Sequence, residues 1–76
     1  MQIFIKTTDR TFVFDVENST TVGSLREMIM NKTGYPDHVY YLIANGKTLG
    51  IREFSMSDYL ITQDTTVTVM FRFGSA

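Results

Sequence analysis

The first seven residues alternate between apolar and polar positions. Ile3 and Ile5 share one side of the alternation, and the polar residues fall mainly on the other side. A period of two is that of a β-strand with one buried face. The run Thr66 to Phe73 alternates in the same way. We therefore expect the first and last strands to lie side by side, with the rest of the chain packed on the face that carries Ile3 and Ile5.

A second alternating run, Thr11 to Val16, follows after three polar residues. Two alternating runs joined by a short polar break predict a β-hairpin. Phe12 and Phe14 share one side of the second run, and we expect both in the core. Phe4 and Val13 then face outward. They are candidates for a second apolar patch, against the simpler interpretation as ordinary exposed apolar side chains.

The middle of the first half carries a helical pattern. Leu25 and Ile29 belong to an apolar stripe whose members recur at intervals of three and four residues. Thr21 precedes the stripe, and its hydroxyl can accept a hydrogen bond from a backbone N–H of the first turn. Gly34 stands where a left-handed residue ends many helices. The pattern predicts a helix over Val22 to Thr33.

The second half predicts a hairpin and a short helical turn before the last strand. Val39 to Asn45 favours a strand, but its parity does not show which side faces the core. Asn45-Gly46 favours a two-residue hairpin turn, because both positions tolerate positive φ; a short strand over Lys47 to Leu49 follows. Ser55 to Tyr59 is typical of a helical turn. The order β-β-α-β-β-turn-β predicts an α+β domain in which one helix covers one face of a mixed sheet.

Composition narrows the class of protein. The 76 residues include no cysteine, so disulfides and thiolate metal sites are not available. The net charge is −1 and the charges are scattered, which argues against nucleic acid as a partner. No apolar run reaches the roughly 18 residues that suggest a membrane span, and no signal-peptide pattern is present. We expect one soluble intracellular domain over residues 1–73, followed by a flexible tail or the start of a linker over residues 74–76.

Catalytic chemistry is not indicated. His38 is the only histidine, and a general acid or base needs a partner group and a pocket. Asp37 precedes it, but no orienting group follows from the pattern. No carboxylate pair, phosphate-binding glycine loop or metal-ligand spacing stands out. We expect a protein that is not an enzyme and needs no cofactor or metal, with His38 in a surface loop.

Several residues, taken in order, resemble the ubiquitin family. The shared positions are Met1 to Thr7, Gly34, Pro36, Leu42, Ile43, Gly46, Lys47, Leu49, Ser57 to Tyr59, Ile61 and Arg72. The resemblance covers the whole chain, and it rests on the ordered set rather than on one motif. It implies a β-grasp fold. It also implies that Leu42 faces inward, whereas Tyr41 and Ile43 face outward.

The resemblance further implies a shallow apolar surface that binds receptor domains. The matching candidate residues are Tyr41, Ile43, Gly46, Lys47, Thr68, Met70 and Arg72. Ile43 and Met70 are apolar residues at solvent-facing parity, and methionine adapts to varied partners. The alternative is that they are ordinary scattered apolar side chains. Thr68 replaces a histidine of the family, Thr8 a leucine and Tyr41 an arginine, so we expect a retuned set of partners.

Covalent conjugation depends on the tail. Modifiers of the family end in a Gly-Gly pair, whose slender backbone threads the activating enzymes. This sequence ends in Arg-Phe-Gly-Ser-Ala, so we expect no conjugation in this form. Lys6, Lys32 and Lys47 match lysines that accept further ubiquitin in the family. The alternative interpretation is that they are three solvated surface lysines.

The function that follows is a noncovalent protein-interaction module of the cytoplasm or nucleus. The implied partners are ubiquitin-receptor domains, enzymes of the ubiquitin pathway or proteasome-type receptors, with neither nucleic acid nor membrane. Two alternatives stay open. One is a ubiquitin-like covalent modifier or a mimic of one, and the other is a ubiquitin variant engineered to bind one target.

Overall fold

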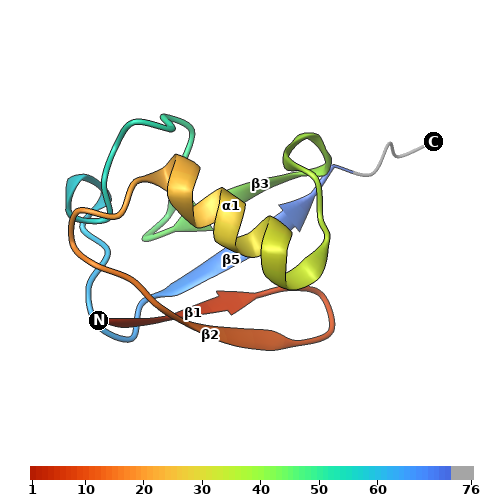
Figure 1. The fold of residues 1–76 in the computed structure, drawn as a ribbon, viewed down its shortest axis with the longest axis horizontal. Helices are drawn as coiled ribbons and strands as arrows, with labels where there is room; N and C mark the ends of the chain where they lie inside the picture. Colours follow the sequence, from red (N-terminus) through yellow and green to blue (C-terminus); the bar gives the residue numbers. More distant parts are fainter. Residues whose placement is uncertain (73–76) are drawn as a thin grey trace.

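Residues 1–72, which the computed structural model describes, form a sheet crossed on one face by a helix (Figure 1). The elements are β1 (Gln2–Lys6), β2 (Thr11–Asp15), α1 (Val22–Thr33), η1 (Asp37–Val39), β3 (Tyr40–Ala44), β4 (Lys47–Thr48), η2 (Ser57–Tyr59) and β5 (Thr66–Phe71), where η marks a 3-10 helix. The five strands lie in the order β2-β1-β5-β3-β4. The predicted α+β domain with a mixed sheet is therefore confirmed.

The centre of the sheet is the parallel pair of β1 and β5. Ile5 lies opposite Val67 in this pair, and both side chains are fully buried, as is Ile3. These strands have the most apolar inner faces, and placing them in the middle of the sheet covers them from both sides. The prediction that the first and last strands are neighbours is confirmed.

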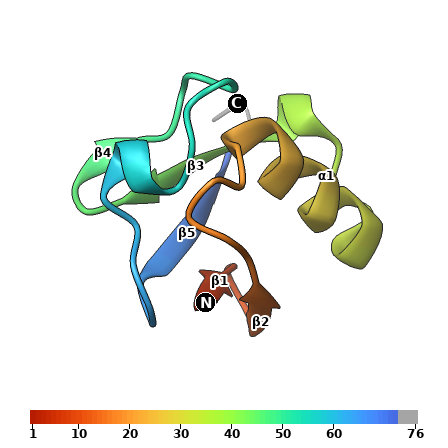
Figure 2. The same ribbon diagram turned by 60° about the vertical axis from the view of Figure 1, so that its left-hand side comes forward.

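The β1–β2 hairpin has the predicted antiparallel pairing, and β2 forms one edge of the sheet (Figure 2). Phe14 is buried, whereas Phe12 is only partly buried and packs against the rim of the core. The prediction that Phe12 lies in the core thus holds only in part, because β2 is an edge strand of the sheet that residues 1–72 form. Val13 is 58% exposed and stands directly opposite Phe4 on the outer face.

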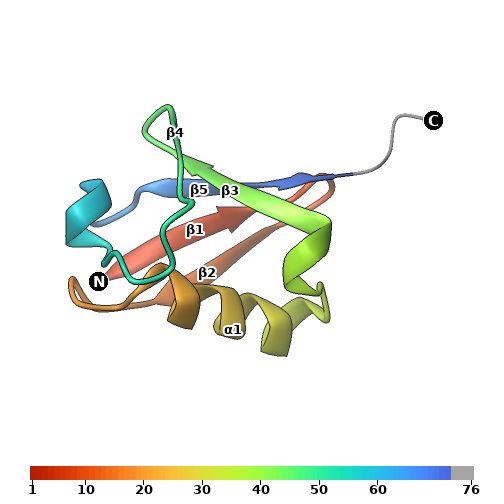
Figure 3. The ribbon, with the colours of Figure 1, turned by 90° about the horizontal axis from the view of Figure 1, so that it is seen from above.

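Helix α1 begins and ends where the sequence predicted. The Thr21 hydroxyl accepts a hydrogen bond from the Ser24 N–H at 3.1 Å, which caps the first turn. Gly34 has φ of 80° and its N–H donates to the Met30 carbonyl at 2.8 Å. Leu25 buries its side chain between the helix and the sheet, and Figure 3 shows α1 on one side of the strands.

The β3–β4 hairpin turns at Asn45 and Gly46, whose φ angles of 53° and 74° are those of a type I′ turn. Leu42 is fully buried, so the implied inward direction of this residue is confirmed. Strand β4 is shorter than predicted and ends at Thr48, and Val39 belongs to η1 rather than to β3. The predicted end of the last strand at Phe73 and the predicted tail over 74–76 lie outside the described residues.

Candidate protein-binding surface

Four outward side chains on β3 and β5 meet on the face of the sheet opposite α1. Tyr41 lies opposite Met70, and Ile43 lies opposite Thr68. Their neighbours along each strand fill the core, and side chains alternate between faces along a strand, so these four point away from it. Met70 is 39% exposed and the other three are half-buried. We refer to Tyr41, Ile43, Thr68 and Met70 as the Ile43–Met70 surface.

Cationic side chains surround this surface. Lys6 stands opposite Thr68 in the parallel β1–β5 pair, Lys47 begins β4, and Arg72 follows β5. All three are exposed. An open hollow of about 330 Å³ adjoins Met70 and extends to Lys6 and Thr8 in the β1–β2 hairpin. The arrangement is a shallow apolar centre with a basic rim, which suits an acidic, partly apolar partner.

Arg72 is held against the Ile43–Met70 surface at three points. Its backbone N–H donates to the Val39 carbonyl at 2.7 Å, and its Nε donates weakly to the Tyr40 carbonyl at 3.4 Å. Its guanidinium carbon lies 5.0 Å from the centre of the Tyr41 ring, within the range of a cation–π contact. Tyr41, which replaces an arginine of the family, therefore positions Arg72, which matches the family.

The hairpin residues of the candidate site lie at the far end of β3. Gly46 occupies the second turn position, where its positive φ favours glycine, and Lys47 pairs with Ala44. Both are exposed. The structure therefore brings all seven candidate residues to β3, β4, β5 or the segments that directly adjoin them.

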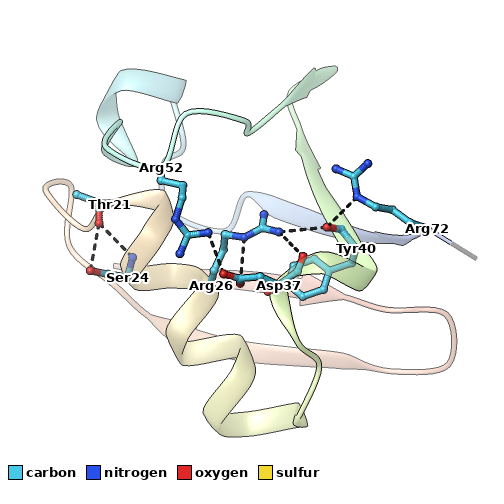
Figure 4. Close-up of polar contacts among 7 residues, drawn as sticks. All are labelled: Thr21, Ser24, Arg26, Asp37, Tyr40, Arg52 and Arg72. Carbon is cyan, nitrogen blue, oxygen red and sulfur yellow. Dashed lines mark hydrogen bonds and ion pairs between the residues drawn. The ribbon is translucent and has the colours of Figure 1, made fainter.

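A buried arginine joins α1 to the start of β3 (Figure 4). Arg26 is 9% exposed, and its Nη2 donates to the carbonyls of Asp37 and Tyr40 at 2.9 and 3.1 Å. Its Nε donates to the Asp37 carboxylate at 3.3 Å, and Arg52 reaches the other carboxylate oxygen at 2.9 Å. This cluster fixes the backbone just before Tyr41 and thereby supports the surface from behind.

Sequence reasoning missed the Arg26 cluster. Neither the helical pattern nor the family resemblance singled out Arg26. One signal was present: Arg26 is four residues after Val22 and three before Ile29, which places it on the apolar stripe of α1. A cation on that stripe must find buried acceptors, and two backbone carbonyls supply them.

Tyr40 is the other unusual buried group. Its side chain is fully buried beneath the Arg26 guanidinium, whose carbon lies 4.6 Å from the ring centre. Within residues 1–72 its hydroxyl has no hydrogen-bond partner. Burial raises the pKa of this hydroxyl above its usual value of 10.0, and the nearby Arg26 charge opposes part of that rise. The hydroxyl is therefore held neutral and unsatisfied.

The residues considered for catalysis do not assemble a reactive centre. His38 is exposed in η1, and the carboxylate of the adjacent Asp37 is taken up by Arg26 and Arg52. Among residues 1–72 no three acidic or histidine side chains gather as metal ligands.

In the same part of the chain no helix has the length and hydropathy to cross a membrane. Lys6, Lys32 and Lys47 are all exposed, which is compatible with either interpretation of the lysines.

Comparison with known proteins agrees with this geometry. The model of the ubiquitin family matches residues 3–74. The solution NMR structure of the ubiquitin-like domain of an Arabidopsis thaliana protein superposes with a TM-score of 0.88 at 22% identity. That match covers 93% of this chain and 76% of the other. The fold is thus the ubiquitin-like β-grasp, and the chain belongs to the ubiquitin family.

Proposed function

We propose that this chain is a protein-interaction module that binds partners noncovalently through the Ile43–Met70 surface. The observation that carries the proposal is the pairing of Tyr41 with Met70 and of Ile43 with Thr68 on the solvent face of two adjacent strands. This pairing joins apolar area that the monomer leaves partly uncovered. The partners would be ubiquitin-receptor domains, ubiquitin-pathway enzymes or proteasome-type receptors, in the cytoplasm or nucleus.

The basic rim supports the same proposal. Lys6, Lys47 and Arg72 would attract an acidic partner and orient it, while the apolar centre supplies the burial. Because Arg72 is already held by Tyr41 and Tyr40, less conformational freedom would be lost when a partner carboxylate approaches it. The module would act without catalysis, as members of the family generally do.

The experiment compares three aspartate variants in titrations with a panel of purified ubiquitin-receptor domains. Met70→Asp and Ile43→Asp place a charge in the apolar centre, and we expect each to weaken binding at least about tenfold. Ile51→Asp is the matched control, because Ile51 is also an exposed apolar residue, at 46%, but lies outside the candidate site. Binding that Met70→Asp and Ile43→Asp leave unchanged would refute the site.

A covalent modifier is the second candidate. The match to the ubiquitin family runs over residues 3–74, and Arg72 among them is exposed directly after β5. The sequence nevertheless has Gly-Ser-Ala where the family has its diglycine. We expect no thioester when the chain is incubated with ubiquitin-activating enzyme and ATP. A thiol-sensitive adduct would favour the modifier instead.

A further inference from the structure

Strand β2 is an edge strand with an open row of backbone groups. In the β1–β2 ladder the Val16 N–H donates to the Met1 carbonyl, and the Thr7 N–H donates to the Arg10 carbonyl, each at 2.8 Å. Hydrogen-bonded pairs alternate along an antiparallel ladder, so the even-numbered residues of β2 bond to β1. The N–H and C=O groups of Thr11, Val13 and Asp15 therefore point away from the sheet.

The usual protections of a sheet edge are weak here. Natural edges are commonly shortened, carry lysine or proline, or are covered by another element. The opposite edge, β4, has two residues and includes Lys47. Strand β2 has five residues, Thr-Phe-Val-Phe-Asp, without lysine or proline. A hollow of about 320 Å³ between β2 and α1, lined by Phe14 and Met28 among others, shows that the helix does not seal this edge.

The sequence of β2 is a near-palindrome about Val13. If a second β2 pairs antiparallel with the first across a two-fold axis at Val13, each Val13 faces its own copy and each Thr11 faces Asp15 of the other chain. These are the three residues whose backbone groups point outward, so the hydrogen-bonding parity of the two strands agrees. The Thr11 hydroxyl can donate to the facing carboxylate, which makes the polar ends complementary as well.

The side chains on both faces support the same register. On the outer face Val13 is 58% exposed and lies opposite Phe4, so pairing would join two Phe4–Val13 pairs into one apolar row. On the inner face Phe12 would lie opposite Phe14 of the second copy. The ring centres of Phe12 and Phe14 already lie 6.5 Å apart within one chain, so four rings would meet across the axis. The net charge of −1 per chain opposes such association only slightly.

We propose that the β2 edge binds a second copy of this chain, strand to strand, in an antiparallel dimer centred on Val13. The two sheets become one continuous sheet, and the Ile43–Met70 surfaces stay uncovered because β1 lies between the β2 edge and the β5–β3 pair that carries them. The contact is one short strand from each chain, so the dimer is weak and depends on concentration. The proposal is independent of what the Ile43–Met70 surface binds.

The test is sedimentation equilibrium on the full chain between about 20 μM and about 1 mM, with amide hydrogen exchange read by NMR at both ends of the range. We expect the dimer fraction to rise with concentration. We also expect the amides of Thr11, Val13 and Asp15 to exchange more slowly at high concentration, whereas those of Phe12 and Phe14 change little. A monomer throughout the range, or protection that appears on β3, β4 or β5 instead, would overturn the proposal.

Charge variants make the test specific. Val13→Lys places two like charges at the axis and should weaken dimerisation at least about tenfold, while Thr48→Lys adds the same charge at the opposite edge and should not. Thr11→Lys should strengthen the dimer about threefold by facing Asp15 of the other copy. Adding Asp15→Lys to Thr11→Lys should reverse that gain. Circular dichroism shows that each variant is folded, and a dimer insensitive to these changes contradicts the register.

Discussion

The guanidinium carbon of Arg72 lies 5.0 Å from the centre of the Tyr41 ring. The same side chain reaches the Tyr40 carbonyl, which also accepts a hydrogen bond from the buried Arg26. The last described residue of the chain is thus connected, through one carbonyl oxygen, to the cluster that joins α1 to β3 (Figure 4). Arg72, one of the three cations of the basic rim, is therefore held in place by the fold.

Replacing the Tyr41 ring should release Arg72. Tyr41→Leu removes the cation–π contact, which contributes about 0.5–1 kcal/mol at an exposed site. We expect greater fast motion of the Arg72 Nε–H, measured by side-chain 15N relaxation. Tyr41→Phe keeps the aromatic face and should preserve the order of Arg72. Equal order of Arg72 in the Leu and Phe variants would show that the backbone and the Tyr40 carbonyl alone hold the side chain.

The buried arginine should matter more to stability than the exposed one. Arg26→Met removes the donor that the Asp37 and Tyr40 carbonyls share and leaves Tyr40 only the weaker bond from Arg72, and we expect it to lower the free energy of unfolding by about 2–4 kcal/mol. Arg52→Met is the matched control, because it also removes one cationic partner of Asp37. That pair is about half exposed, so its loss should cost less than about 1 kcal/mol. Urea unfolding measures both, and equal losses would contradict the different roles.

The Tyr40 hydroxyl should contribute nothing favourable at neutral pH. Its oxygen is buried without a partner among residues 1–72, so Tyr40→Phe should leave stability unchanged or raise it by up to about 1 kcal/mol. Urea unfolding of the two proteins at pH 7 checks this. A clear loss of stability in Tyr40→Phe would reveal a hydrogen bond to a buried water.

The same substitution should alter the alkaline limit of stability. The pKa of Tyr40 is raised above 10.0 in the folded protein by burial, so the unfolded chain releases this proton at a lower pH than the folded one. Ionisation of Tyr40 therefore costs no stability below pH 10. The free energy of unfolding falls as the pH rises from there through the folded pKa. Tyr40→Phe should lose less stability than the parent protein above pH 10, as measured by urea unfolding at a series of pH values. Parallel pH profiles would contradict this.

Two glycines with open surroundings should respond differently to alanine. A Cβ at Gly34 or at Gly50 would meet no atom within 4 Å, but Gly34 has φ of +80°. Gly34→Ala should therefore lower the free energy of unfolding by about 1 kcal/mol, through backbone strain alone. Gly50→Ala should be neutral or stabilise slightly, because alanine restricts the unfolded chain. Thermal unfolding of the two variants provides the comparison.

Local signals predicted the elements that depend on local contacts. Thr21 caps the start of α1 and Gly34 caps its end, each through a hydrogen bond within its own turn. Their residue types were therefore sufficient to predict both bounds of the helix. The same holds for Asn45 and Gly46, whose turn depends only on two φ angles. The outward direction of Ile43 did not follow from its own segment, since both parities of that strand are apolar. It followed from the resemblance to the family.

Contacts between distant segments could not be predicted in this way. The acceptors of Arg26 lie 11 and 14 residues further along the chain, and the Tyr40 carbonyl that Arg72 reaches lies 32 residues earlier. The half-exposure of Phe12 depends on β2 being an edge strand, which is a property of strand order rather than of parity. The candidate surface was predicted as a set of residues, but its link to the buried cluster became visible only in three dimensions.

The central β1–β5 pair determines how the protein responds to mechanical force. The strands are parallel, so β1 begins and β5 ends at opposite ends of the sheet (Figure 1). Tension applied before Gln2 and after Phe71 pulls the two strands along their length in opposite directions. Their ladder of hydrogen bonds, which begins with the Phe4 N–H donating to the Thr65 carbonyl at 2.9 Å, is then loaded as a whole instead of opening bond by bond. We therefore expect this topology to resist traction along the strands better than traction across them.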